Sequence, residues 1–290
     1  MLTLICLLNF LISEVQADPI PEGFKKATIG FVFLCDTNGQ PTHAIGTCFF
    51  VRVKLQGDLA AAYLVTARHV LQTTNGNWLP QVLVRFSKTN GGVDFVTFPL
   101  NQTNSPFRVY ASKEPGVDLA VVPVASTIMT SYQISALPAG LIAAEESVRS
   151  LKIREGDDMF FMGLFTPFYG SKANIPVVRF GRLSMLTDEK ISADTDGPQN
   201  YYLMETQVFG GNSGSPVFFY FDERRNPNDT SILLAGVVKG YFYNYSPVKF
   251  VDASPIPYAT ENNGIALVTP AYKLLELLNS AELKQTRGEK

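Results

Sequence analysis

The sequence predicts an all-β fold in which two six-stranded antiparallel β-barrels are followed by a C-terminal helix. Twelve short runs rich in Val, Ile, Phe and Tyr recur along the chain, and most are bounded by Gly, Pro, Asn or Asp. So many short strands favour barrels or sandwiches. The pattern pauses once, from about Ser126 to Glu155, which divides the chain into similar halves. We therefore expect a first barrel in residues 18–135 and a second in residues 136–290.

Each half contributes six of the expected strands. In the first half they are ATIGFVFLC (27–35), GTCFFVRV (46–53), AAAYLVT (60–66), QVLVRF (81–86), DFVTF (94–98) and LAVVPV (119–124). In the second half they are MFFMG (159–163), VVRFGRL (177–183), YYLMET (201–206), SPVFFYF (215–221), ILLAGVVKG (232–240) and GIALVT (264–269).

One segment has a convincing helical pattern. After Pro270, apolar side chains recur at helical spacing through Ala271, Leu274, Leu275 and Leu278. We expect this helix to pack against the second barrel.

Composition limits the classes of function. The 290 residues are 46% hydrophobic and 17% charged, which is typical of a globular protein with a large core. The formal net charge is -2, so nothing in the charge balance favours nucleic acid or a membrane surface as a partner.

The N-terminal residues resemble a secretory signal peptide. An apolar run from Leu2 to Ile12 is followed by Val15-Gln16-Ala17, so we expect residues 1–17 to be removed and the mature chain to begin at Asp18. No Lys or Arg precedes the run, which leaves an uncleaved anchor or a buried segment as alternatives. Eleven residues are too few to cross the roughly 30 Å of a bilayer core as a helix. The prediction is a secreted or periplasmic protein with no membrane insertion after cleavage.

Two cysteines, Cys35 and Cys48, remain after the leader, which contains Cys6. They form either a disulfide or two buried thiols, and the sequence favours neither. Asn-X-Ser/Thr sequons lie at Asn101, Asn228 and Asn244.

The stretch GGNSGSPVF (210–218) raises the question of catalysis. A turn leading into a strand would use the same Gly, Asn, Ser and Pro residues, so Ser213 matters only if the chain supplies partners for it. There are two histidines. His69 follows an apolar strand, where an imidazole could lie at a cleft, whereas His43 follows a turn-like stretch and is expected to be solvated.

A base histidine needs an orienting carboxylate. Asp118 begins an apolar run that would carry its side chain into the interior, where a carboxylate must be paired. Asp58 and Asp94 are alternatives, but each lies in a polar, glycine-containing stretch. We therefore expect Asp118 to be the partner of His69.

Three motifs in this order, LVTARHV (64–70), VDLAVVPV (117–124) and GGNSGSPVF, resemble the catalytic motifs of chymotrypsin-type serine proteases. GTCFFV and NGIALVTPAYKLLELL resemble the flanking strand and the last strand and helix of that family. The resemblance implies Ser213 as nucleophile, His69 as base and Asp118 as the residue that orients it. It also implies an oxyanion hole formed by the N–H groups of Gly211 and Ser213.

Details of these motifs indicate which branches of the family the chain resembles. Where digestive enzymes have an aspartate before the nucleophile, this chain has Asn212, which cannot pair with a new N-terminal amine. GNSGSP and the lack of a cysteine after His69 look more like the bacterial glutamyl endopeptidase and HtrA-type branches. The terminal peptide-binding domain of HtrA proteins is missing, so we expect a compact, monomeric, single-module protease.

Substrate-binding residues are implied by the same resemblance. Gln207 lies where trypsin-like enzymes place an acidic pocket floor, and Gly264 matches the glycine that keeps the pocket open. A neutral floor argues against a strong Arg or Lys preference. Val238 and Lys239 replace the histidine of glutamyl endopeptidases, and Lys239 either attracts an acidic side chain or, as we expect, is solvated.

The expected function is an exported serine endopeptidase that works through an acyl-enzyme, with protein or peptide substrates. No metal or cofactor is expected. The alternative is a noncatalytic binding protein on the same fold. The triad of Ser213, His69 and Asp118 is intact, which favours the enzyme.

Overall fold

The computed structural model describes residues 20, 25, 29–100, 108–193, 197–221, 232–247 and 258–289. The predicted signal peptide, residues 1–17, lies outside these ranges, as do two of the sequons, Asn101 and Asn228. None of the helices in the described ranges is long and apolar enough to cross a bilayer.

Within the described residues, the first half forms an eight-stranded sheet that does not close into a barrel. Its strands run in the spatial order β5-β4-β1-β2-β3-β7-β6, and β8 pairs in parallel with β2. A second closed barrel is therefore not confirmed. The strands are β1 (Ile29–Cys35), β2 (Pro41–Lys54), β3 (Ala60–Thr66), β4 (Gln81–Ser87), β5 (Val93–Pro99), β6 (Tyr110–Ala111), β7 (Ala120–Val124) and β8 (Leu137–Pro138).

The second half forms the closed six-stranded barrel that the sequence predicts. The strands close in the order β10-β11-β14-β13-β12-β9, with every neighbouring pair among them antiparallel. The strands are β9 (Asp158–Gly163), β10 (Val177–Met185), β11 (Tyr202–Glu205), β12 (Pro216–Tyr220), β13 (Ile232–Pro247) and β14 (Tyr258–Pro270).

The two halves share a hydrophobic core. The apolar strands of the two halves bury one face against each other, because side chains on a strand alternate between faces. Phe160 and Phe218 stack inside this core with ring centroids 5.1 Å apart. Its buried members include Phe31, Phe49, Val51, Val65 and Val121 of the first half and Phe160, Met162, Phe218, Leu234 and Val237 of the second.

Two helices at the C-terminal end cover this core. They are α4 (Ala271–Leu278), which confirms the predicted helix, and α5 (Ala281–Thr286). Leu274 and Leu283 are fully buried. The helices hold the first half as well as the second barrel, because Arg287 donates to the Tyr63 hydroxyl at 3.2 Å. Other short helices in the described chain are η1 (Arg68–Leu71), α2 (Ser126–Ser131), η2 (Ala139–Leu141) and α3 (Glu145–Ser150).

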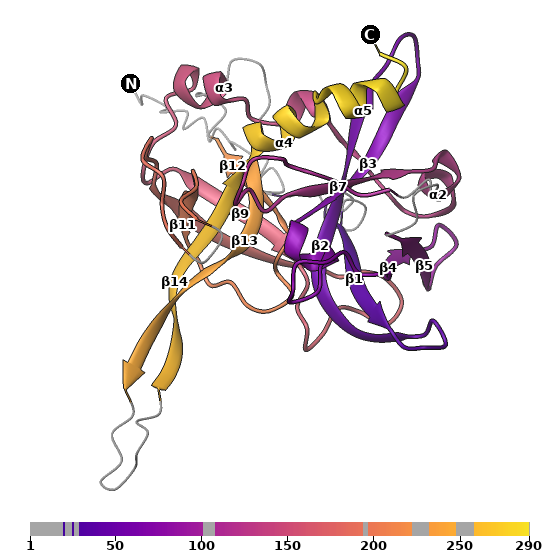
Figure 1. Ribbon diagram of the computed structural model, residues 1–290, viewed down its shortest axis with the longest axis horizontal. Helices are drawn as coiled ribbons and strands as arrows, with labels where there is room; N and C mark the ends of the chain where they lie inside the picture. The colour runs from indigo at the N-terminus through magenta and orange to yellow at the C-terminus, as the bar shows by residue number, and fades with distance from the viewer. Residues whose placement is uncertain are drawn as a thin grey trace, which may run out of the picture.

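β13 and β14 are longer than the sequence suggests, and together they form a ribbon that projects from the body of the molecule (Figure 1). They pair from Gly236 opposite Pro270 to Pro247 opposite Tyr258. The third sequon, Asn244, lies in this ribbon.

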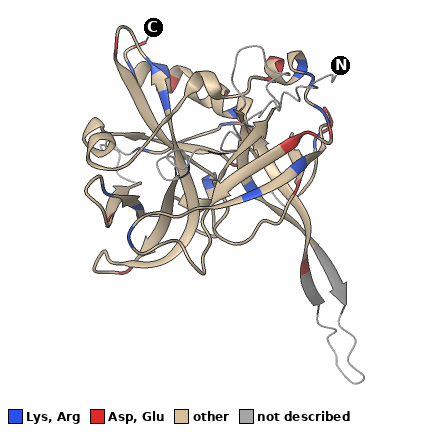
Figure 2. Ribbon diagram, turned by 180° about the vertical axis from the view of Figure 1, so that it is seen from behind, with Lys and Arg blue, Asp and Glu red and all other residues tan. Residues whose placement is uncertain are grey.

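Charged residues of both signs are scattered over the described chain (Figure 2).

Cys35 and Cys48 are two free thiols. In the β1–β2 pair Cys48 lies opposite Gly30 and Cys35 lies opposite Pro41, so the strand register places the thiols near opposite ends of β1. Cys48 is fully buried, and burial raises the pKa of its thiol far above the usual range. The Cys35 sulfur accepts a hydrogen bond from the Gln81 amide at 3.1 Å.

Candidate active site

His69 is presented by a short turn at the end of β3. The strand ends at Thr66, and residues 68–71 form a 3₁₀ turn whose apolar members, Val70 and Leu71, are buried. These two side chains anchor the turn in the core. The His69 side chain is 49% exposed, so the turn leaves the imidazole accessible to a substrate.

Asp118 lies just before β7 and holds both the main chain and the ring of His69. One carboxylate oxygen, Oδ2, lies 2.5 Å from His69 Nδ1, and the other, Oδ1, accepts the His69 main-chain N–H at 2.9 Å. Asp118 is 2% exposed. Because Nδ1–H donates to the carboxylate, the neutral ring presents Nε2 as its proton acceptor.

The pKa of Asp118 is lowered although the group is buried. Burial by itself raises the pKa, since it removes water from the carboxylate. The hydrogen bonds and charge of His69 outweigh that effect, and the ammonium of Lys239 also lowers the pKa. Asp118 is therefore ionised at neutral pH.

Ser213 lies on a turn whose shape depends on two glycines. Gly211 and Gly214 have φ angles of +93° and +85°, a region that favours glycine. Asn212 holds the turn from inside the protein: its Nδ2 donates to the Leu164 carbonyl at 2.7 Å, and its Oδ1 accepts the Phe209 N–H at 2.9 Å. The turn is thus fixed without an ion pair.

The main-chain N–H groups of this turn differ in their partners. Those of Asn212, Gly214 and Ser215 donate to main-chain carbonyls at 2.8–3.0 Å. Those of Gly211 and Ser213 have no hydrogen-bond partner within the described part of the chain. Two N–H groups, separated by one residue, are therefore left to bind an acceptor from outside the protein.

Thr47, on β2, joins the serine turn to the first half, and sequence reasoning did not select it. Its hydroxyl donates to the Gly211 carbonyl at 2.8 Å and accepts the Leu164 N–H at 2.9 Å. Its N–H donates to the Ser213 carbonyl at 2.9 Å, and its carbonyl accepts the Thr66 hydroxyl at 2.7 Å. The one signal in the sequence is a hydroxyl within the apolar run GTCFFV.

The serine turn lies against the segment that carries His69. A Cβ atom added to Gly214 would lie 2.2 Å from the Thr66 hydroxyl oxygen and 3.2 Å from the Ala67 nitrogen. In the described chain Ser213 Oγ donates to the Lys239 carbonyl at 3.1 Å and makes no hydrogen bond to His69. Nucleophile–base hydrogen bonds are often absent or long without substrate.

The three predicted substrate-binding residues have different surroundings. Gln207 is exposed, and a Cβ atom on Gly264 would lie 3.4 Å from its amide nitrogen, so these two residues face each other. Lys239 is only 8% exposed, and its ammonium donates to the Tyr201 hydroxyl at 3.0 Å. The expectation of a solvated lysine is therefore wrong.

The alternative residues lie elsewhere. Asp94 accepts hydrogen bonds from its neighbour Phe95 and from the Tyr132 hydroxyl, and it pairs with Lys88 at 3.6 Å. Asp58 is exposed and precedes β3, whereas His69 follows that strand. His43 is exposed on β2, as expected.

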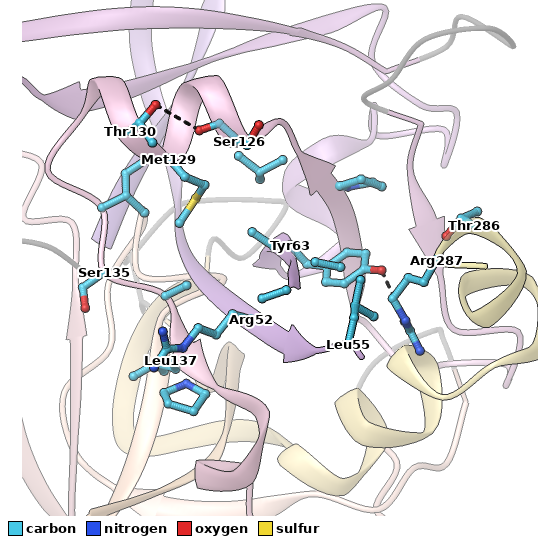
Figure 3. A pocket seen from close by; sticks show the side chains of 18 of the residues that line it. Arg52, Leu55, Tyr63, Ser126, Met129, Thr130, Ser135, Leu137, Thr286 and Arg287 are labelled. Atoms are coloured by element: carbon cyan, nitrogen blue, oxygen red, sulfur yellow. Dashed lines mark hydrogen bonds between the residues drawn. The ribbon is translucent and has the colours of Figure 1, made fainter. Parts of the chain in front are cut away.

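A groove of about 1240 Å³ lies away from these residues (Figure 3). It is lined by the first residues of β3 and the last residues of β7, whereas His69 follows the end of β3 and Asp118 precedes β7. Tyr63, Met129, Leu137 and Arg287 are among the side chains around it.

Comparisons with known proteins show which family the chain belongs to. A sequence comparison with curated proteins finds no match. Among solved structures, one titled "Crystal structure of Deg5" is 13% identical with a TM-score of 0.46, and the alignment covers 91% of this chain and 92% of that one. The family model of the trypsin-like peptidase domain matches residues 46–222, which is more than half of the chain. This protein therefore belongs to the trypsin-like peptidase domain family.

Proposed function

We propose that this protein is a serine endopeptidase that uses Ser213, His69 and Asp118. The observation that carries the proposal is the geometry around the serine: His69 is locked by Asp118 at 2.5 Å, and the N–H groups of Gly211 and Ser213 are open within the described chain. These are the base and the oxyanion donors that acyl transfer needs.

The reaction begins when the Ser213 hydroxyl turns from the Lys239 carbonyl toward His69 Nε2. His69 removes the hydroxyl proton as Ser213 Oγ forms a bond to the substrate carbonyl carbon. The carbonyl oxygen becomes an oxyanion, which the N–H groups of Gly211 and Ser213 stabilise. Asp118 stabilises the imidazolium that forms and keeps its orientation.

The tetrahedral intermediate then collapses to an acyl-enzyme. The C–N bond breaks, and the imidazolium gives its proton to the leaving amine. Water attacks the ester in the second half-reaction, with His69 again taking a proton. The products are a carboxylate and an amine, and Ser213 recovers its hydroxyl proton.

Three further properties belong to the same proposal. Export as a secreted or periplasmic protein rests on the apolar leader, and we expect the peptidase unit to act as a monomer. Gln207 and Gly264 form a neutral pocket for the substrate side chain, so we expect no strong preference for Arg or Lys. Protein or peptide substrates follow from the reaction class.

One observation favours the second candidate, a noncatalytic binding protein. Ser213 Oγ is bound to a main-chain carbonyl rather than to His69. A serine held there at all times would not attack a substrate. The two functions differ in whether this hydroxyl ever reaches the imidazole.

Labelling by a fluorophosphonate probe separates the two functions. The purified protein is expected to become labelled and to cleave casein, and Ser213→Ala is expected to do neither. His43→Ala serves as the matched control and retains both properties. A folded wild-type protein that neither labels nor cleaves casein would favour the binding protein.

A further inference from the structure

The groove of about 1240 Å³ lies beside a free end of strand β3. The pairing of β3 with β7 begins at Ala62, opposite Val124, so within the described residues Ala60 and Ala61 have a strand partner only on the β2 side. Successive residues of a strand direct their main-chain groups to opposite edges. One of these two alanines therefore directs its N–H and C=O away from β2, on the side where β7 has ended.

Residues from both faces of β3 line the groove. Side chains of a strand alternate between faces, so Ala60 and Ala62 lie on one face of the sheet, whereas Ala61 and Tyr63 lie on the other. A single cavity reaches both faces of a strand only along its edge. The alanine side chains are short, which leaves this edge accessible to another chain.

The charged residues that line the groove are Arg52, Arg108 and Arg287, and no Asp or Glu is among its described lining residues. Arg108 pairs with Glu282 at 2.8 Å, and Arg287 pairs with Glu289 at 2.9 Å. Arg52 is exposed, and its side chain makes no hydrogen bond or ion pair within the described part of the chain. Its guanidinium is therefore available to an anion from outside the protein.

A second cavity, of about 450 Å³, adjoins the groove and shares Arg52, Ala60 and Pro138 with it. It adds one cation, Lys54, and one acid, Asp58. Lys54 lies two residues after Arg52 on β2, so both side chains are on the same face of the sheet. The positive charge beside the free end of β3 thus continues along β2.

We propose that this groove binds an extended peptide with acidic side chains, which adds as a strand to the free end of β3. The main-chain groups of β3 pair with the peptide backbone, and a peptide carboxylate pairs with Arg52. A free phosphate or a lipid headgroup also carries negative charge, but neither supplies the N–H and C=O groups that extend a sheet.

The two faces of β3 define the side chains that such a peptide should carry. Arg52 lies opposite Ala62 and therefore on the same face of the sheet, whereas the Tyr63 ring lies on the other face (Figure 3). A peptide in which acidic and apolar residues alternate places its carboxylates toward Arg52 and its apolar side chains toward Tyr63.

The site does not depend on the proposed protease activity. β3 is seven residues long, so its free end lies about 20 Å from the end that leads to His69. A peptide in the groove leaves the candidate triad open. The groove thus holds a partner or a substrate protein while the catalytic residues remain accessible.

Fluorescence anisotropy tests the site in the chain that carries Ser213→Ala, so that the measurement does not involve cleavage of the probe. The probe is a fluorescein-labelled peptide in which Val alternates with Glu. Arg52→Ala is expected to weaken its binding about tenfold, the effect of one lost charge-assisted hydrogen bond. Arg52→Lys keeps the charge and should lose less. Arg154→Ala removes an exposed arginine outside the groove, so this matched control should leave Kd unchanged.

Changes in the probe test the strand edge without altering the protein. A peptide in which Gln replaces Glu should bind more weakly than the acidic peptide and should not respond to Arg52→Ala. Methylation of the main-chain nitrogens of alternate residues removes the donors from one edge of the peptide. Of two peptides methylated at opposite sets of residues, one should therefore lose binding.

Three results would overturn the inference. They are an unchanged Kd in Arg52→Ala, binding of both methylated peptides as tight as that of the unmethylated one, and absence of binding by the acidic peptide. In the last case, Arg52-dependent binding of vesicles that contain phosphatidylserine would assign the groove to a lipid surface instead.

Discussion

The Thr47 hydroxyl donates to the Gly211 carbonyl at 2.8 Å, across the junction between the open sheet and the closed barrel. The Gly211 carbonyl belongs to the peptide bond between Gly211 and Asn212, and Asn212 directly precedes the proposed nucleophile. One threonine of the first half thus fixes the backbone that carries the proposed oxyanion donor in the second half.

Thr47→Val is expected to weaken both stability and activity. Valine has nearly the same shape but leaves the buried Gly211 carbonyl and Leu164 N–H without their partner, at a cost of about 1–3 kcal/mol for each unsatisfied group. Denaturant unfolding and kcat/KM measure the two effects. Thr47→Ser, which keeps the hydroxyl, should recover most of the activity. If the Val variant turns over as the wild type does, Thr47 has no role in holding the turn.

Loss of triad members should be unequal and non-additive. Ser213→Ala and His69→Ala are each expected to reduce kcat by roughly 10⁴–10⁶-fold, and the double variant scarcely more, because nucleophile and base act as one unit. Asp118→Asn should lower kcat by about 10⁴-fold at neutral pH, since an amide favours the wrong tautomer of the ring.

The control for this series is Asp94→Asn, since Asp94 is bound to Tyr132 and Lys88. Steady-state kinetics with a peptide ester or casein measures each variant. A large loss in Asp94→Asn combined with an active Asp118→Asn would show that the carboxylate is wrongly assigned.

Asn212→Asp should damage the serine turn at neutral pH. The carboxylate cannot donate to the buried Leu164 carbonyl, which Asn212 Nδ2 reaches at 2.7 Å, so a negative charge would lie against an acceptor. A protonated carboxyl group can donate, so the defect should decrease as the pH falls toward about 4, the usual range of an aspartate pKa. Thermal unfolding at several pH values checks this, and a pH-independent defect would contradict it.

A free N-terminal amine at Asp18 should not be needed for activity. Because Asn212 is held by main-chain groups and forms no ion pair, residues added before Asp18 are expected to leave kcat/KM nearly unchanged. The comparison is between chains that begin at Asp18 with and without an extension. Activity that disappears on extension and returns on trimming would show that a free amine is needed.

Asp118 should contribute stability that depends on pH. Its folded-state pKa is lowered, so the carboxylate stabilises the fold above the unfolded pKa of about 3.9, and this contribution is lost as pH falls through the folded pKa. Asp118→Asn should therefore destabilise the fold most near pH 7 and progressively less below about pH 4. Urea unfolding of both proteins at neutral pH and at two acidic pH values on either side of the unfolded pKa tests the trend. A difference that is constant over this range would count against it.

Much of the fold could be predicted because strand patterns are local. The apolar run PVFFY of β12 and the spacing of Leu274 and Leu278 indicate a strand and a helix without knowledge of their partners. The closed first barrel that the sequence predicts is not confirmed, since closure depends on which strand edges meet and the local pattern does not show this. The length of the β13–β14 ribbon was not predicted, because its outer part includes Tyr and Asn residues and does not form the apolar run of a core strand.

The candidate site was predictable to a similar extent. The motifs around His69, Asp118 and Ser213 each combine a reactive side chain with a local pattern that predicts a strand or a turn. Thr47 was missed because threonine is common in strands, and nothing in GTCFFV shows that its hydroxyl reaches another segment. Lys239 was misjudged as solvated because a single lysine in a strand pattern does not reveal that Tyr201 covers its ammonium.

The shared core has a consequence for synthesis of the protein. Phe31 and Val51 leave the ribosome early, but they pack in a cluster with Phe218 and Leu274, which are made much later. During translation the open sheet must therefore keep an apolar face uncovered until the barrel and α4 emerge. Folding of the first half is therefore completed only after the last helices have been made.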